Sequence, residues 1–534
     1  MKHLNFFKSA LLTLLILCSN FVWAHDFEVD GIFYNVIDET NQTVEVTYKG
    51  TTAYEYSKEY SGNIVIPETV TFNEADYRVE GIAQRAFCEC STLINIDIPN
   101  SIIYIEEYAF THCTKLENIN LSNSLTKIER GTFYGCTNLI KVNIPDNVTG
   151  IGENAFAECE HLEEIKLGKG VEYIDKYAFK NCSAFTRLII PNNVIKIDNF
   201  VFENCTALNE LIIEDGKTPL EMGYMTYRPD LGDLQYRSIF YNSPLKQVYI
   251  GRNLQYDIEA YPIYSPFQSK YQLTNVYIGK CVTTLGEYLF RNCTSLENIY
   301  FHSNPTIGTD AIPSTATCHL ILDDSNMIDF NTANSNTYSD VSYTRIISER
   351  RYGTIMLPFA PNTASLENYA FYELAESSDR YMRFEEVATP IANVPYIYTL
   401  RDGKENVAIT GGETSISSNI VTPEVDGWQT VGSFSNQTID TSNGNYYALS
   451  ATDNEINRIT KNLTVLPYRA YFKSSNASKS ALSIYISGTT GVKEISSSEI
   501  DGFENGGIFD LSGRKVTEPT KGNLYIVNGK KIIF

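Results

Sequence analysis

Apolar residues recur along the middle of the chain with a period of 23 residues. A phenylalanine marks each period, and a cysteine follows it three positions later. The phenylalanines are Phe87, Phe110, Phe133, Phe156, Phe179 and Phe202, and the cysteines are Cys90, Cys113, Cys136, Cys159, Cys182 and Cys205. A fixed period of about 20 to 50 residues predicts a solenoid, in which each repeat forms one coil that packs only against its neighbours.

Each cysteine is followed by an apolar trio with the spacing L-x-x-I-x-I, as in Leu139, Val142 and Ile144. The last two apolar positions alternate with a polar one, which predicts a short strand with one buried face. The period resumes at Phe290, after two degenerate coils that keep the trio. Their trios are Leu245, Val248, Ile250 and Leu273, Val276, Ile278. We therefore expect about nine coils, each contributing one strand to a parallel sheet.

The full repeat reads A-F-x-x-C-T-x-L-x-x-I-x-I-P-x-x-V-x-x-I, with good copies at residues 155–174 and 178–197. This pattern resembles the BspA-type leucine-rich repeat of bacterial surface proteins over roughly residues 81–325. The resemblance implies a right-handed solenoid in a mainly β protein, and a role in adhesion to host or neighbouring-cell surfaces.

The flanking segments predict further β modules. Residues 25–80 alternate apolar and polar positions, and a solenoid needs a cover over its exposed first coil, so they are expected to form an N-terminal β cap. Residues 340–488 lose the 23-residue period. Strand-like runs such as 353–359 and 428–434, separated by polar loops, predict an antiparallel, β-sandwich-like domain there.

Two short segments follow that domain. Residues 489–506 are rich in Ser, Glu and Gly and are expected to form a linker. Residues 507–534 predict three strands, with a turn at Ser512-Gly513 and a hairpin at Asn528-Gly529. They resemble the C-terminal sorting sequence of type IX secretion. A small terminal β module without a sorting role is the alternative.

The first residues predict export. Lys2 and Lys8 precede an apolar run, and Val22-Trp23-Ala24 offers a cleavage site, so residues 1–24 are interpreted as a signal peptide. A lipoprotein anchored through Cys18 is the alternative. No later apolar run approaches the roughly 20 residues of a membrane helix. Together with the tail, this predicts a protein secreted by a Gram-negative bacterium or held on its outer surface.

Ten cysteines remain after cleavage at this site. Seven of them, the six above and Cys293, occupy one repeat position, which indicates small buried core residues rather than disulfides. Cys88, Cys281 and Cys318 lie off register and are the better candidates for a bridge. Metal ligation is not expected, because the Cys88-x-Cys90 pair lacks a second pair and the histidines are scattered.

Charge and motifs limit the function further. The net charge of −22 disfavours nucleic acid and anionic membranes. No familiar catalytic, nucleotide-binding or metal motif occurs, so we expect no enzyme activity, no catalytic residues and no cofactor. Two functions remain. The solenoid binds an extracellular protein or glycan, or it is a spacer that displays a C-terminal β-domain which does the recognising. The oligomeric state is not predicted.

The outward residue between the last two apolar positions of each trio changes along the solenoid. From the first coil onward it is Asp97, Asn120, Asn143, Lys166, Ile189, Ile212, Tyr249, Tyr277 and Tyr300. Because tyrosine combines a rigid apolar face with a hydroxyl group, we predict that Ile189, Ile212, Tyr249, Tyr277 and Tyr300 form the binding surface. Two tyrosine-rich insertions, at 214–238 and 251–265, lie nearby. The alternatives are that tyrosine simply favours strands, or that the column packs against residues 340–490.

Overall fold

A computed structural model describes residues 25–50, 59–223, 238–257, 265–325, 336–346 and 352–486 with short gaps after residue 378, and short strands beyond 492. The gaps after residue 378 are 379–380, 402–405, 417–418, 451–454 and 476–479. The predicted signal peptide and most of the predicted linker and insertions lie outside these residues. The chain forms two units, residues 1–299 with 305–316, and residues 300–304 with 317–534.

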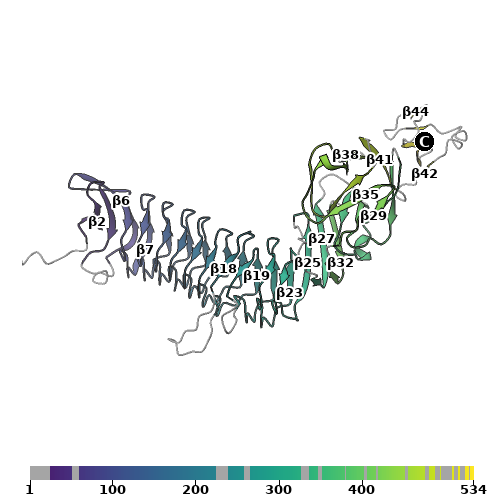
Figure 1. The fold of residues 1–534 in the computed structure, drawn as a ribbon. Coiled ribbons are helices and arrows are strands. Elements are labelled where there is room, and N and C mark those ends of the chain that lie inside the picture. The colour runs from purple at the N-terminus through teal and green to yellow at the C-terminus, as the bar shows by residue number, and fades with distance from the viewer. Residues whose placement is uncertain are drawn as a thin grey trace, which may run out of the picture. The chain divides into compact units, whose positions relative to one another are not determined.

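The first unit is a stack of coils (Figure 1). Its core is a file of phenylalanines. Neighbouring rings lie parallel, with centroids 4.9 to 5.8 Å apart. The file runs through Phe87, Phe110, Phe133, Phe156, Phe179, Phe202, Phe240, Phe267 and Phe290. These rings are fully buried, which confirms a mainly β, leucine-rich-repeat-like solenoid core.

The trio of each coil forms a strand on the first side of the solenoid. In one parallel sheet these strands are β4 (Ser61–Val65), β7 (Thr92–Asp97), β9 (Asn118–Asn120), β11 (Lys141–Asn143) and β13 (Glu164–Lys166). Another sheet continues the same side with β15 (Arg187–Ile190), β17 (Glu210–Ile213), β19 (Gln247–Ile250) and β21 (Asn275–Ile278). β23 (Asn298–Phe301) crosses the boundary between the two units.

Most coils also form a second strand, which the sequence did not predict. On this second side, β10 (Lys127–Ile128), β12 (Gly150–Ile151), β14 (Tyr173–Ile174), β16 (Lys196–Ile197), β18 (Leu220–Met222) and β20 (Leu254–Gln255) make a parallel sheet. β22 (Thr284–Leu285) and β24 (Thr306–Ile307) pair separately. The predicted strand of each coil thus has a second one beside it, which was missed because two or three residues are too few to give a visible alternation.

The second sheet is interrupted between β20 and β22, and side chains span the interruption. Asn253 Oδ1 accepts hydrogen bonds from the backbone N–H groups of Thr283 and Thr284, at 2.8 and 3.1 Å. The Tyr256 hydroxyl donates to the carbonyl oxygen of Glu287 at 2.9 Å. The stack of coils therefore continues without the strand ladder.

Tight turns connect the two sides. The residues two positions before and two after the file phenylalanine have positive φ in most coils, as at Gly131 (φ 60°) and Gly135 (φ 70°) around Phe133. A Cβ at either glycine would lie within 2.4 Å of a side chain of the preceding coil, Tyr108 or His112, so both need glycine.

The N-terminal end of the first unit carries a separate sheet. Its strands are β1 (Phe27–Val29), β2 (Ile32–Asp38), β3 (Thr43–Thr47), β5 (Thr69–Phe72) and β6 (Ala75–Ile82), and β8 (Tyr104–Ile105) pairs with β6. Tyr60 extends the phenylalanine file toward this sheet, because its ring lies 4.5 Å from Phe87 and its hydroxyl donates to the carbonyl oxygen of Thr47.

The second unit begins with two parallel strands, β25 (Thr317–Asp323) and β27 (Asp340–Ile346), and β32 (Asn406–Gly411) pairs antiparallel with β27. Two separate two-stranded sheets also occur in this unit. In one, β26 (Thr337–Tyr338) pairs with β33 (Thr414–Ser415), and in the other, β36 (Gln437–Ile439) pairs with β39 (Leu463–Val465). The 3-10 turns are η2 (Thr363–Leu366) and η3 (Thr441–Asn443).

A ten-stranded sheet makes up most of the second unit. In order, its strands are β28 (Tyr352–Met356), β31 (Pro395–Leu400), β29 (Tyr369–Ser377), β30 (Tyr381–Val387), β41 (Ala481–Ile486), β38 (Glu455–Arg458), β37 (Asn445–Leu449), β40 (Arg469–Ser474), β35 (Trp428–Ser433) and β34 (Glu424–Val425). Neighbours are antiparallel except β30 and β41, which are parallel, whereas the sequence predicted an antiparallel arrangement throughout. Its core includes Tyr372, Phe384, Trp428 and Phe472.

The last residues form a small sheet of five strands. They are β42 (Lys493–Glu494), β46 (Lys530–Ile533), β45 (Leu524–Val527), β43 (Ile508–Phe509) and β44 (Lys515–Val516). β45 and β46 pair antiparallel on either side of the predicted Asn528-Gly529 hairpin, and these two turn residues lie outside the described residues.

Candidate functional site

Four of the five predicted binding residues lie side by side on the first side of the solenoid. Strand pairing places Ile189 opposite Ile212, Ile212 opposite Tyr249, and Tyr249 opposite Tyr277. Adjacent parallel strands lie about 4.8 Å apart, so the four side chains form a continuous column. We call these four residues the apolar column.

The apolar column projects outward because its strands alternate strictly. In β15 the residues on either side of Ile189 are buried, whereas Ile189 is 38% exposed. Ile212, Tyr249 and Tyr277 are half-buried between pairs of buried residues. Each apolar face is thus accessible while the strand that carries it is anchored in the core.

Tyr249 is held in place by the preceding coil. Its hydroxyl donates a hydrogen bond of 2.9 Å to Oδ1 of Asp215. Burial and this contact raise the pKa of the Tyr249 phenol, so it stays protonated and keeps donating. Gly279 leaves room for the pair, since a Cβ there would lie 2.4 Å from Asp215 Oδ1 and 2.7 Å from the Tyr249 oxygen. The ring is therefore fixed before any partner arrives.

A buried arginine ties together the coils that carry the column. Arg252 is fully buried, and its Nη1 and Nη2 donate to the carbonyl oxygens of Asn192 and Pro191, each at 2.9 Å. These carbonyls follow β15, and Arg252 follows β19, so the contact spans the intervening coil. Burial lowers the pKa of the guanidinium, but an arginine remains charged at any physiological pH.

Tyr300, the fifth predicted residue, belongs to the second unit. Its ring stacks on His319, with centroids 4.8 Å apart and planes 19° apart. His319 Nδ1 lies 2.8 Å from Oδ2 of Asp340 on the neighbouring strand β27. Within the two tyrosine-rich insertions, residues 224–237 and 258–264 lie outside the described residues, whereas Tyr256 is described.

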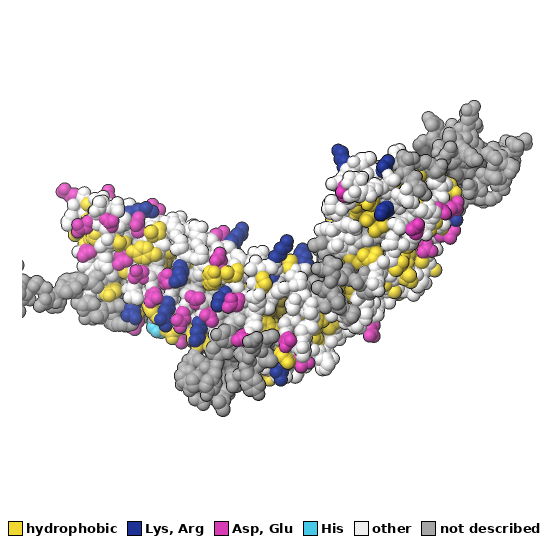
Figure 2. Space-filling model, in the orientation of Figure 1, with side chains coloured by type: hydrophobic (Ala, Val, Ile, Leu, Met, Phe, Trp, Pro, Cys, Tyr) yellow, Lys and Arg dark blue, Asp and Glu magenta, His cyan; other side chains and the backbone are white. Residues whose placement is uncertain are grey.

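In the earlier coils, the residues at the repeat position of the apolar column are polar. Asp97, Asn120, Asn143 and Lys166 are exposed, and Asn120 Nδ2 donates to Asp97 Oδ1 at 3.3 Å. In the view of Figure 2, charged side chains of both signs are dense on the solenoid near its N-terminal end and sparser near β19 and β21. The surface therefore changes character along the solenoid.

The described residues contain neither a cluster of metal ligands nor a membrane-spanning helix. In the described part of the chain no group of three or more His, Cys, Asp or Glu side chains is arranged to hold a metal ion. Within the same residues, no helix is long and apolar enough to cross a membrane.

Sequence reasoning missed one column inside the solenoid. Ser243 and Lys270 occupy the cysteine position of the two degenerate coils, three residues after Phe240 and Phe267. The signal was available, because both coils keep the file phenylalanine. The loss of the repeat cysteine in these two coils hides their register.

A family model describes the same coils. The BspA type leucine rich repeat region matches in six copies at residues 80–209 and 236–343. Over these residues the chain is similar to the BspA-type leucine-rich repeat family. No curated protein matches the chain.

Solved leucine-rich repeat structures are similar at low identity. A leucine-rich repeat protein from Bacteroides ovatus is 24% identical, covers 57% of this chain and 99% of its own, and has a TM-score of 0.25. A leucine rich cell surface protein from Faecalibacterium prausnitzii is 21% identical, with 56% and 89% covered and a TM-score of 0.31. The leucine rich repeat protein of Treponema pallidum is 23% identical, with 41% and 100% covered and a TM-score of 0.33.

Proposed function

We propose that this BspA-type solenoid is a non-enzymatic binding protein of the cell surface, and that its apolar column holds an extracellular protein. The observation that carries the proposal is the in-register file of Ile189, Ile212, Tyr249 and Tyr277, accessible on the outside of anchored strands. Preorganised tyrosines contribute contact area at a low entropic cost, which suits protein recognition.

The charge of the chain indicates what kind of protein would fit. At −22, the chain attracts basic surfaces and repels acidic ones. Asp215, which holds Tyr249, adds a carboxylate beside the column. Glu210, on the same strand as Ile212, is paired with Arg187 at 3.0 Å. The proposed partner is therefore a protein with an apolar patch in basic surroundings.

Display at the surface is part of the same proposal. It assigns residues 1–24 as a signal peptide, 25–80 as an N-terminal cap, 81–325 as a right-handed solenoid of about nine coils, 340–488 as a β-sandwich-like domain, 489–506 as a linker, and 507–534 as a type IX-like sorting module of a Gram-negative bacterium. Deleting residues 507–534 should retain the protein in the periplasm. Unchanged surface display would favour a terminal module without a sorting role.

The spacer function predicts a polar solenoid surface throughout. The accessible isoleucines and tyrosines argue against it, because a mere support gains nothing from exposed apolar side chains.

The proposal is tested by replacing Tyr249 and Tyr277 together with serine in the full chain. The control replaces Asn120 and Asn143, which occupy the same repeat position in polar coils, with serine. Binding to a panel of immobilised extracellular matrix proteins is measured beside the melting temperature. We expect the tyrosine variant alone to lose binding, with its melting temperature nearly unchanged. A lowered melting temperature, or equal binding by both variants, would contradict the proposal. Tyr300 is left intact because it packs on His319.

A further inference from the structure

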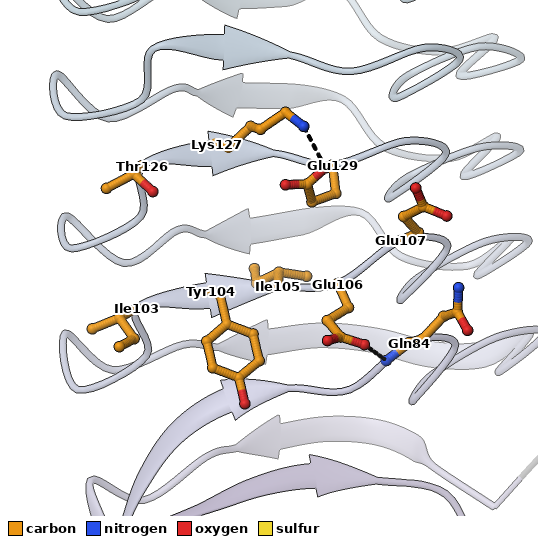
Figure 3. A pocket seen from close by; sticks show the side chains of 9 residues that line it. All are labelled: Gln84, Ile103, Tyr104, Ile105, Glu106, Glu107, Thr126, Lys127 and Glu129. Atoms are coloured by element: carbon orange, nitrogen blue, oxygen red, sulfur yellow. Dashed lines mark hydrogen bonds and ion pairs between the residues drawn. The ribbon is translucent and has the colours of Figure 1, made fainter. Parts of the chain in front are cut away.

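A groove opens on the second side of the solenoid, away from the apolar column. It lies where the second sheet is interrupted between β8 and β10, and it encloses about 420 Å³. Its lining comes from three successive coils (Figure 3): Gln84, Ile103, Tyr104, Ile105, Glu106, Glu107, Thr126, Lys127 and Glu129. Its size falls within the range of small-molecule sites.

The Tyr104 ring is laid across the neighbouring strand. Gly81 of β6 pairs with Tyr104 of β8, and a Cβ added at Gly81 would lie 2.1 Å from the Tyr104 Cζ and 2.4 Å from its Cε2. The ring thus fills the space that a side chain at position 81 would take. Its hydroxyl donates to Oε2 of Glu45 at 3.0 Å, which fixes the far end of the ring. One face rests on the glycine, and the other is available to the groove.

Polar groups flank this ring and are themselves held in place. The Glu106 carboxylate accepts a hydrogen bond from the backbone N–H of Gln84 at 3.0 Å. Across the groove, Lys127 Nζ contacts Glu129 Oε2 at 2.7 Å. The lining holds three glutamates and one lysine, so it is net acidic.

We propose that this groove is a binding subsite for a neutral saccharide. One face of a pyranose ring carries C–H groups and packs on an aromatic face, while its hydroxyls at the rim both donate and accept hydrogen bonds. Tyr104 offers the face, the carboxylates of Glu106 and Glu129 accept, and Lys127 donates. An acidic sugar is disfavoured by the excess of carboxylates. The proposal concerns a different side of the solenoid from the apolar column and does not depend on it.

The chain contains a matched comparison three coils further on. Tyr173 occupies the same repeat position as Tyr104, and strand pairing places it opposite Gly150, as Tyr104 is opposite Gly81. A Cβ at Gly150 would meet nothing nearer than the Tyr173 carbonyl oxygen at 4.0 Å. The Tyr173 ring therefore does not lie over its glycine. The same residue pair forms a fixed platform at one place and not at the other.

This contrast defines the experiment. The full chain is titrated by calorimetry with lactose, cellobiose, mannobiose and chitobiose, and with sialyllactose as the acidic probe. We expect at least one neutral disaccharide to bind and sialyllactose to fail. Gly81→Ala should displace the ring and weaken binding by about tenfold or more, as should Tyr104→Leu, while Tyr104→Phe keeps the ring and stays within about threefold.

The controls Tyr173→Leu and Gly150→Ala should bind like the unchanged chain, and all variants are checked by thermal melting. The proposal is overturned if no neutral disaccharide binds, if binding survives both Gly81→Ala and Tyr104→Leu, or if the groove instead takes a peptide in a Tyr104-dependent way. Because the variants lie on the second side, their outcome is separate from that of the Tyr249 and Tyr277 experiment.

Discussion

The Sγ of Cys136 donates a hydrogen bond of 3.1 Å to the carbonyl oxygen of Phe110 in the preceding coil. The same bond joins Cys113, Cys159, Cys182, Cys205 and Cys293 to the phenylalanine 26 residues earlier. Ser243 and Lys270 keep it, donating to the carbonyl oxygens of Phe202 and Phe240. All of these residues, whether Cys, Ser or Lys, therefore donate from this position to a carbonyl oxygen of the preceding coil.

Substitutions at Cys136 should rank by their ability to donate. Cys136→Ser keeps a donor and should cost about 1 kcal/mol. Cys136→Ala removes one of the two hydrogen bonds that the Phe110 carbonyl accepts, the other coming from the Cys113 N–H, and opens a cavity, at about 2 kcal/mol. Cys136→Asp buries an uncompensated charge and should cost roughly 3–5 kcal/mol. Urea unfolding measures the three. If alanine proved less harmful than serine, the position would be purely apolar.

Lys270 should make stability depend on pH in the alkaline range. Burial lowers its pKa from 10.5 to about 8. Between these values the unfolded chain binds the proton more tightly than the folded chain, so stability should rise with pH from about 8 to 10.5. Lys270→Cys restores the repeat residue, and it should raise stability at pH 7 and remove this rise. The unfolding free energies of both chains are measured at pH 7 and at pH 10. The difference between the chains should change between the two pH values. The same difference at both would contradict the role of Lys270.

The cysteines should react only after unfolding. All ten described cysteines are free, and eight are buried, while Cys281 and Cys318 are partly accessible. Burial raises the pKa of Cys136 to about 12, so its reactive thiolate is scarce as well as shielded. A thiol reagent should label at most two sites in the folded protein, and the remaining eight in denaturant without reductant. Sites that stay unlabelled in denaturant would reveal disulfides.

A buried ion network should govern the stability of the second unit. Asp324 contacts Arg345 at 3.0 Å and Arg469 at 2.7 Å, and it accepts a hydrogen bond from the Tyr343 hydroxyl. Burial alone would raise the pKa of Asp324, but Arg345, Tyr343 and Arg469 outweigh it and hold the pKa below its usual range. The stabilisation is present above the unfolded carboxyl pKa and is lost as pH falls through the lower folded value.

Asp324→Asn leaves the Arg345 guanidinium buried without its counter-ion and should destabilise the unit by roughly 3 kcal/mol. Calorimetry of the full chain at pH 7 and pH 3 measures it, with Asp440→Asn as an exposed control. The gap between Asp324→Asn and the unchanged chain should shrink at pH 3. An equal difference in stability at both pH values would mean that the effect of the substitution does not depend on the ionisation of Asp324.

The solenoid was predictable because its repeat forces the same residue into the same place. The phenylalanine at the position of Phe133 is buried in every coil, and the apolar residue at the position of Val142 is buried in all of them except Ile165, which is partly buried. The period alone therefore located the core and the first-side strands. The second-side strands were not predictable, because each has only two or three residues. The position of the Tyr104 ring over Gly81 was not predictable either. Tyr173 is opposite a glycine in the same register, yet its ring does not lie over that glycine. The parallel pairing of β30 with β41 joins segments about 100 residues apart, which local patterns do not encode.

The apolar column is tested most directly by crosslinking from within it. A photoreactive phenylalanine analogue placed at position 212, between Ile189 and Tyr249, is compared with the same analogue at position 120, its equivalent in a polar coil. Each full chain is irradiated with the matrix protein that the panel selects. The account predicts a crosslinked complex from position 212 and none from position 120. Crosslinking from position 120 alone, or equally from both, would contradict the claim that the column is the binding surface.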